Sequence, residues 1–182
     1  MQAARQLAPE GMTIAPIEVG ELPFYSADVE AEGDPASVAA FKASVLEADG
    51  VLIATPEYND GIPAVLTNAI DWGSRFPGRS PLAGKPVALM GASPSQVGTA
   101  RAQLHLRQLL GHVHARTLPP PELLLAKAHE KFDSALRLTD EGARHVLTAL
   151  LERFARWMAR ERAIAEGEQA LATPGPHRRR ST

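Results

Sequence analysis

Apolar positions along the chain fall into short continuous runs that alternate with stretches of helical spacing. The runs at residues 51–54, 86–90 and 122–126 are almost entirely apolar. Such runs are typical of strands that are buried on both faces, as in parallel sheets. Residues 12–19 alternate only roughly and contain Pro16, which removes a ladder donor, so they predict an edge strand.

Amphipathic helices are predicted between these runs. Asp34 and Pro35 form a helix start, a capping side chain followed by proline at the first helical position, and this helix extends to about Ala48. Further helices are expected over residues 63–75 and 99–110 and from Thr139 onward. Their apolar stripes comprise Val38, Phe41 and Val45; Val65, Leu66, Ala69, Ile70 and Trp72; and Val146, Leu147, Leu150, Leu151, Phe154, Trp157 and Met158.

Strands separated by single helices imply right-handed crossovers and a doubly wound parallel α/β sheet. Residues 2–8 have the character of a helix end, with no strand before them. The apolar pattern fades after residue 162. The sequence therefore predicts one domain over residues 1–162 and a disordered tail over residues 163–182.

Composition removes several classes of function. The formal net charge is −2 and aromatic residues make up 5%, so neither a polyanion-binding surface nor a base-stacking platform is expected, and nucleic acid is not a predicted partner. No run approaches the ~18 apolar residues of a membrane span, which favours a cytoplasmic protein away from membranes. The chain has no cysteine, so electron chemistry requires a bound cofactor.

Two loops at strand ends are candidate ligand sites. In residues 55–63, Pro56 and Pro63 stiffen the ends while Asn59 and Gly61 tolerate positive φ, so the backbone amides can face a planar ligand; an ordinary βα turn fits equally well. The Asn-Asp-Gly pattern also suggests a hairpin, which the helical pattern after Pro63 opposes. Residues 91–98 follow a strand and open a helix, which favours free amides and a helix dipole on the ligand side.

The segment Val51-Leu-Ile-Ala-Thr-Pro-Glu-Tyr-Asn-Asp-Gly-Ile-Pro-Ala-Val-Leu-Thr-Asn-Ala-Ile-Asp-Trp72 resembles the "TPEYN…PxxLKNAIDW" signature of the NADPH-dependent FMN reductases. Similar segments follow in order at residues 81–87, 91–93, 100–108, 130–133 and 137–140. The family includes quinone, chromate and azo-compound reductases. The resemblance implies a flavodoxin-like, three-layer α/β/α fold.

The resemblance also implies a site and its ligands. The isoalloxazine ring of FMN is expected against Pro56, Glu57, Tyr58 and Asn59, and Ala92 and Ser93 are expected to border it from the neighbouring strand. NADPH or NADH is the implied electron donor and a small molecule the implied acceptor. Members of the family associate, so a homodimer or homotetramer is expected. No protein acid, base or nucleophile is required, because the flavin itself receives the hydride.

Three departures from the family pattern stand out. Thr67 replaces a usual lysine, and Ser95-Gln96 replaces a more glycine-rich loop. The family also begins with a strand and a Gly-Ser-Leu-Arg-type loop that holds the FMN phosphate, and residues 1–182 do not include them. In the strand order 2-1-3-4-5, that strand lies between residues 12–19 and residues 51–55, so the 12–19 segment is expected to lack its partner.

Two other functions are compatible with these observations. One is an N-terminally truncated, non-catalytic flavodoxin-like dimerisation domain with weak or no FMN binding. The other is an electron carrier that does not oxidise NAD(P)H. Several other polar residues suggest a function, but a structural or surface role is favoured for each. The functional interpretations are a metal pair for His112 and His114, a catalytic carboxylate for Asp71, phosphate ligands for Arg101 and Arg107, and a nucleic-acid contact for Arg178, Arg179 and Arg180.

Overall fold

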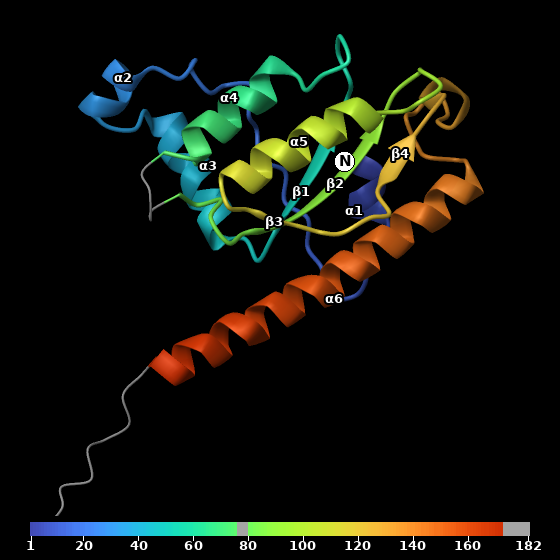
Figure 1. Cartoon of the computed structure of the whole chain (residues 1–182). Coiled ribbons are helices and arrows are strands. Elements are labelled where there is room, and N and C mark those ends of the chain that lie inside the picture. The colour runs from blue at the N-terminus through green and yellow to red at the C-terminus, as the bar shows by residue number, and fades with distance from the viewer. Residues whose placement is uncertain (76–79, 173–182) are drawn as a thin grey trace, which may run out of the picture.

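The computed structural model describes residues 1–75 and 80–172, with side chains described as far as residue 167 (Figure 1). Its helices are α1 (Gln2–Gln6), α2 (Ala27–Glu32), α3 (Ala36–Glu47), α4 (Ala64–Gly73), α5 (Ala100–His112) and α6 (Glu141–Ala172), with a short 3₁₀ helix, η1, at Ala128–Glu130. Its strands are β1 (Val51–Thr55), β2 (Pro86–Ala92), β3 (Arg116–Thr117) and β4 (Leu123–Leu125).

All strand pairs in the described sheet are parallel, which confirms the predicted sheet type. β1 pairs with β2 along its whole length, from Val51 beside Val87 to Thr55 beside Gly91. The start of β2 pairs with β3, which the sequence analysis did not predict, and its end pairs with β4. Three prolines, residues 119–121, separate β3 from β4. Because proline has no N–H to donate, this stretch cannot continue the ladder.

Helices cover both faces of the sheet, so the expected three-layer arrangement is confirmed (Figure 1). Side chains of α3, α4 and α5 form one core cluster with Val87 and Leu89 of β2. Side chains of α1 and α6 form the other cluster with Ala88 and Met90 of the same strand. Alternate residues of β2 therefore enter opposite cores, and its continuous apolar sequence follows from this double burial.

The expected edge strand over residues 12–19 is wrong, because no residue of this segment is in a strand. The alternation is nevertheless real: Ile17 and Val19 pack against the core of α3 to α5, while Met12 and Ile14 pack against the core of α1 and α6. Within the described ranges, residues 13–18 form no main-chain hydrogen bonds. An edge strand needs a neighbour, and this segment has none.

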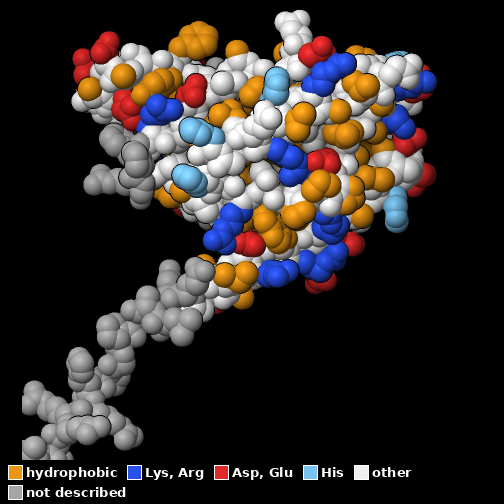
Figure 2. Space-filling model, in the orientation of Figure 1, with side chains coloured by type: hydrophobic (Ala, Val, Ile, Leu, Met, Phe, Trp, Pro, Cys, Tyr) orange, Lys and Arg blue, Asp and Glu red, His pale blue; other side chains and the backbone are white. Residues whose placement is uncertain are grey.

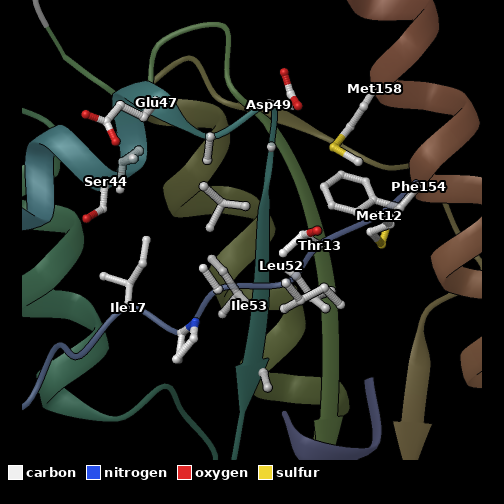
Figure 3. A pocket seen from close by; sticks show the side chains of 18 of the residues that line it. Met12, Thr13, Ile17, Ser44, Glu47, Asp49, Leu52, Ile53, Phe154 and Met158 are labelled. Carbon is white, nitrogen blue, oxygen red and sulfur yellow. The ribbon is translucent and has the colours of Figure 1, made fainter. Parts of the chain in front are cut away.

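A cavity of about 960 Å³ lies between residues 12–19 and β1 (Figure 3). Figure 3 shows Ile17, Ile53 and Phe154 around it, side chains from three separate parts of the chain. Among the described residues β1 pairs with β2 alone, so its other edge faces this cavity without a partner strand. The cavity thus lies where the family resemblance places a strand between residues 12–19 and residues 51–55.

Helix boundaries depart from prediction at two places. Asp34 does not cap α3; Pro35 is the N-cap residue, and the Asp34 carboxylate accepts a hydrogen bond from Lys42 Nζ at 2.7 Å instead. α6 continues to Ala172, so the boundary expected after residue 162 falls inside a helix. Surface ion pairs of Arg162 with Asp49 and of Glu161 with Arg116 connect this part of α6 to the segment before β1 and to β3. Residues 173–182 lie outside the described residues.

Two residues assigned to buried stripes are exposed: Val65 of α4 is 48% and Val146 of α6 is 44% accessible. Both lie beside the correct stripe, one residue before buried or half-buried partners. In the part of the chain that the structure describes, no helix is long and apolar enough to cross a membrane.

Candidate functional site

A tight four-residue turn, Tyr58 to Gly61, dominates the loop between β1 and α4. The Tyr58 N–H donates to the Gly61 carbonyl at 3.0 Å, and the Gly61 N–H donates to the Tyr58 carbonyl at 2.9 Å. The central residues, Asn59 and Asp60, have φ angles of 49° and 59°. Two successive positive φ angles define a type I′ turn, which asparagine and aspartate tolerate. The hairpin is limited to this one bridge, because α4 begins at Ala64.

This turn leaves main-chain donors free. The amide groups of Glu57, Asn59 and Asp60 donate to no described residue. The Tyr58 side chain is 62% exposed beside them. Thr55 fixes the start of the loop, since its side chain is buried and its hydroxyl donates to the Pro56 carbonyl at 2.7 Å. A rigid loop therefore presents several unpaired N–H groups and an aromatic ring at the carboxyl edge of the sheet.

The Glu57 carboxylate points to the neighbouring helix and not to solvent. Its Oε2 accepts hydrogen bonds from the backbone amides of Arg101 at 2.9 Å and Ala102 at 3.0 Å. The side chain is 6% exposed. Both amides belong to the first turn of α5, where helix N–H groups lack intrahelical partners. The first candidate loop is thus bonded directly to the helix that follows the second.

The second candidate loop, after β2, is fixed against β4. Ser93 is buried, its N–H donates to the Leu125 carbonyl at 3.0 Å, and its hydroxyl accepts from the Ser95 N–H at 3.2 Å. The prediction of free amides here is therefore wrong for Ser93, and for Arg101 and Ala102 in the first turn of α5, whose amides bond to Leu125 and Glu57. It holds for Gln96 and Val97, whose amides donate to no described residue.

Strand register brings the two loops together. Thr55 lies beside Gly91 in the ladder, so Pro56 and Ala92 follow at adjacent positions on the same edge. The segments that carry all six predicted site residues, Pro56 to Asn59 and Ala92 with Ser93, therefore meet at the carboxyl ends of neighbouring parallel strands. In open α/β sheets, this edge is where ligands bind.

Two buried polar side chains, Thr99 and Gln103, pack beneath the second loop, and no sequence pattern predicts them. Gln103 of α5 is 2% exposed, and its Nε2 donates to Thr99 Oγ1 at 2.9 Å and to the Leu123 carbonyl at 3.0 Å. Its Oε1 has no partner among the described residues. A buried glutamine on a helical stripe has no distinctive sequence signal, because polar residues at such positions are usually exposed.

The Asn and Trp of the signature segment anchor a third part of the chain. Asn68 Nδ2 and Trp72 Nε1 both donate to the Pro23 carbonyl, at 3.0 and 2.8 Å. Asn68 Oδ1 accepts from the Tyr25 N–H at 2.8 Å. These two residues therefore fix residues 23–25 against α4, and their role in this structure is architectural.

The remaining sequence candidates that the structure describes lie apart from the two loops or already have partners, and Arg101 is the candidate that lies at the first loop. Arg107 donates to Glu122 at 2.6 Å and to the Leu118 carbonyl at 3.0 Å, so its guanidinium is held in place. Oδ1 of Asp71, on α4, lies 3.9 Å from Nη2 of Arg75, which follows the helix.

Arg101 Nη1 donates to Asp60 at 2.6 Å, and its side chain remains 55% exposed at the edge of the first loop. Within the described ranges, no three His, Asp or Glu side chains are close enough to bind a metal ion. Arg178, Arg179 and Arg180 lie outside these ranges.

The face that carries α5 shows hydrophobic side chains interspersed with charged ones (Figure 2). Val97, Leu104 and Leu124 are 45%, 59% and 41% exposed. Val97 belongs to the second candidate loop and Leu104 to α5, so exposed apolar side chains occur both at the site and on the adjacent helix.

Comparison with known proteins places the same features in a wider group. The model of the NADPH-dependent FMN reductase family matches residues 1–130. A NAD(P)H-dependent FMN reductase of Pseudomonas aeruginosa is 43% identical over 162 residues, which span 89% of this chain and 87% of that protein. A quinone reductase of Pseudomonas putida is 37% identical over 163 residues, or 90% of this chain and 87% of that protein.

A solved structure gives the same result. The flavoenzyme NAD(P)H:(acceptor) oxidoreductase FerB of Paracoccus denitrificans superposes with a TM-score of 0.80 at 33% identity, over 88% of this chain and 87% of that chain. The predicted flavodoxin-like fold class is therefore confirmed at the level of the whole sheet and its helices.

Proposed function

Because the chain belongs to the NADPH-dependent FMN reductase family, we propose that it is a NAD(P)H-dependent flavoprotein oxidoreductase that uses FMN to reduce a quinone, free flavin or similar small acceptor. The observation that carries this proposal is the pair of βα loops that lie side by side at the carboxyl edge of β1 and β2. Their residues match the family segments expected to contact the flavin.

The donor set of the first loop fits the edge of a flavin ring. An isoalloxazine has carbonyl oxygens and ring nitrogens along one edge, which accept hydrogen bonds. The free amides of Glu57, Asn59 and Asp60 are main-chain donors in a fixed turn, and fixed donors orient a ligand without an ordering cost when it binds. Ala92 and Ser93 border the same space from the neighbouring strand.

The role of the protein in this reaction is positional. Bound FMN supplies the hydride-accepting centre. Pro56 and the 58–61 turn orient the ring, Tyr58 covers it with an aromatic surface, and the buried layer of Thr99 and Gln103 keeps the second loop in place. The space beside the two loops would then admit NAD(P)H and the acceptor in turn.

The acceptor class and the assembly are further parts of the proposal. Proteins similar to this chain carry the name quinone reductase, which supports a quinone as the acceptor. The exposed apolar residues on the α5 face, Val97, Leu104 and Leu124, support association of two copies next to the site.

Flavin titration followed by turnover tests the function. We expect the purified protein to quench FMN fluorescence in a saturable manner, and the loaded protein to oxidise NADPH only when a benzoquinone is added. Binding without NADPH oxidation indicates an electron carrier. Absence of any quenching at millimolar FMN indicates a non-catalytic dimerisation domain and overturns the proposal.

A further inference from the structure

Glu57 holds a buried negative charge at the junction between the first loop and α5. Its side chain is 6% exposed, whereas carboxylates are rarely buried unless other groups compensate the charge. Its loop lies next to the proposed flavin ring, so the carboxylate and the backbone amide of this residue need separate explanations.

The compensation comes from α5. Glu57 Oε2 accepts from the amides of Arg101 and Ala102 at 2.9 and 3.0 Å. The N-cap residue of α5, Thr99, makes no side-chain cap, because its hydroxyl accepts from Gln103 instead. Glu57 therefore performs the capping role from another segment, and its charge also interacts favourably with the positive end of the helix dipole.

A second contact fixes the other side of the turn. Arg101 Nη1 lies 3.5 Å from Glu57 Oε1 and 2.6 Å from Asp60 Oδ1. Asn59 and Asp60 have positive φ angles, which the type I′ turn requires, and the Arg101 contact adds a side-chain bond that holds the turn against α5. The turn is thus attached to α5 at its start through Glu57 and at its centre through Asp60.

We propose that Glu57 is a positioning residue. Its carboxylate caps α5, and this bond holds the turn so that the free amides of Glu57, Asn59 and Asp60 point at the flavin position. The inference depends on the proposed function, because it explains how the proposed flavin contacts are pre-ordered. The carboxylate acts through the turn and α5, while the ring is contacted by the main chain.

The two candidate loops are mechanically joined as a consequence. α5 begins where the second loop ends, and Glu57 connects it to the first loop. Displacement of the α5 terminus therefore moves both walls of the site. Loss of this one carboxylate is expected to weaken flavin binding without changing any group that touches the ring.

The experiment compares Glu57→Ala and Glu57→Gln with the native chain and with Glu32→Gln, which removes an exposed carboxylate at the end of α2. Hydrogen exchange of peptides covering residues 56–62 and 99–104 is measured by mass spectrometry. FMN affinity is measured by fluorescence quenching, and global stability by the urea midpoint.

We expect Glu57→Ala to accelerate exchange in both segments, with β2 unchanged, and to weaken FMN affinity about tenfold or more. Glu57→Gln keeps an oxygen that accepts both amides, so it should restore affinity to within about fivefold of the native protein. The Glu32→Gln variant should match the native protein in both measurements.

Unchanged exchange and unchanged FMN affinity in Glu57→Ala would overturn the inference. Uniform acceleration of exchange in both Glu57 variants, including β2, also overturns it, because it shows a general loss of stability. If the native chain binds no FMN, the proposed function fails. The exchange of residues 56–62 and 99–104 then still decides whether Glu57 holds the turn.

Discussion

Gly91 lies where three segments of the chain approach one another at the end of β2. A Cβ atom at this position would lie 2.0 Å from Thr99 Oγ1 and 2.6 Å from the Thr55 carbonyl oxygen. The second of these atoms belongs to the backbone of β1 and cannot rotate away. Only glycine therefore lets the start of α5 pack directly onto the ends of β1 and β2.

We predict that Gly91→Ala lowers the free energy of unfolding by about 3 kcal/mol, because the methyl group forces the ends of β1 and α5 apart. Gly111→Ala is the matched control on α5, since a Cβ there meets nothing within 4 Å and alanine favours a helix. Urea unfolding at neutral pH measures both. Equal stability of the two variants would contradict this account of Gly91.

The positions of the site residues could be predicted from the sequence, but the contacts of their side chains could not. The Thr-Pro-Glu-Tyr-Asn pattern located the loop, and strand spacing located its neighbour. The destination of the Glu57 carboxylate was not predictable, because it depends on a helix that begins more than forty residues later in the chain. The unpaired Oε1 of Gln103 could not be predicted either, since it depends on how α5 packs against β4.

At the scale of elements, α6 is attached to the sheet by a short apolar stripe. Leu147, Leu150, Leu151 and Phe154 are all buried, and Leu151 is fully so. Beyond Phe154 the helix becomes progressively exposed, and residues 162–167 are all accessible. The docking energy of this 32-residue helix is therefore concentrated in its first half.

Leu151→Ala is expected to cost about 3 kcal/mol of unfolding free energy, because it removes buried surface and leaves a cavity. Val146→Ala, on the same helix but 44% exposed, should cost less than about 1 kcal/mol. Denaturant unfolding followed by circular dichroism compares the two. A similar loss in both variants would show that α6 does not dock through the buried stripe.

The start of α6 adds a pH-dependent element. The Asp140 carboxylate accepts from the Ala143 N–H at 2.8 Å and pairs with Lys131 Nζ at 3.2 Å. The bond from Ala143, followed by the one from Lys131, lowers the pKa of Asp140 below its ordinary value. A lowered pKa in the folded state means that this stabilisation is complete above the ordinary value and is lost as pH falls through the folded one.

Asp140→Ala should therefore reduce stability at pH 7, and by progressively less as pH falls below the ordinary pKa of an aspartate toward the lowered folded-state pKa of Asp140. Asp140→Asn, which keeps an acceptor for the Ala143 amide, should lose less at pH 7. Urea midpoints at pH 7, 5 and 3 measure the differences. A gap between native and alanine proteins that stays constant with pH would count against the cap.

Most elements followed from the local sequence pattern, and the failures arose where an element depends on a distant segment. The apolar runs of β1, β2 and β4 are strong signals because burial on both faces demands them. β3 has two residues and no such run, so only its neighbour on the sheet defines it. Residues 12–19 have the alternation of a strand, yet pairing is a property of two segments and cannot be predicted from one.

At the scale of the whole molecule, β2 organises everything else. It contributes side chains to both cores, pairs with all three other described strands, and ends at the candidate site. The cavity of about 960 Å³ and the candidate site lie beside the same strand, β1, one along its unpaired edge and the other at its carboxyl end. Any movement of β1 therefore affects the site directly, since the 56–61 turn follows this strand in the chain.

The unpaired side of β1 has a consequence for the behaviour of the protein in concentrated solution. A strand that leaves main-chain donors and acceptors without partners is a template for pairing with another molecule, and such templates promote aggregation. We expect the apparent molecular mass from light scattering to rise with protein concentration. Ala54→Lys, which places a charge at an exposed position of this strand, should suppress that rise. Equal scattering from the two proteins would indicate that residues 12–19 and α6 already shield this backbone.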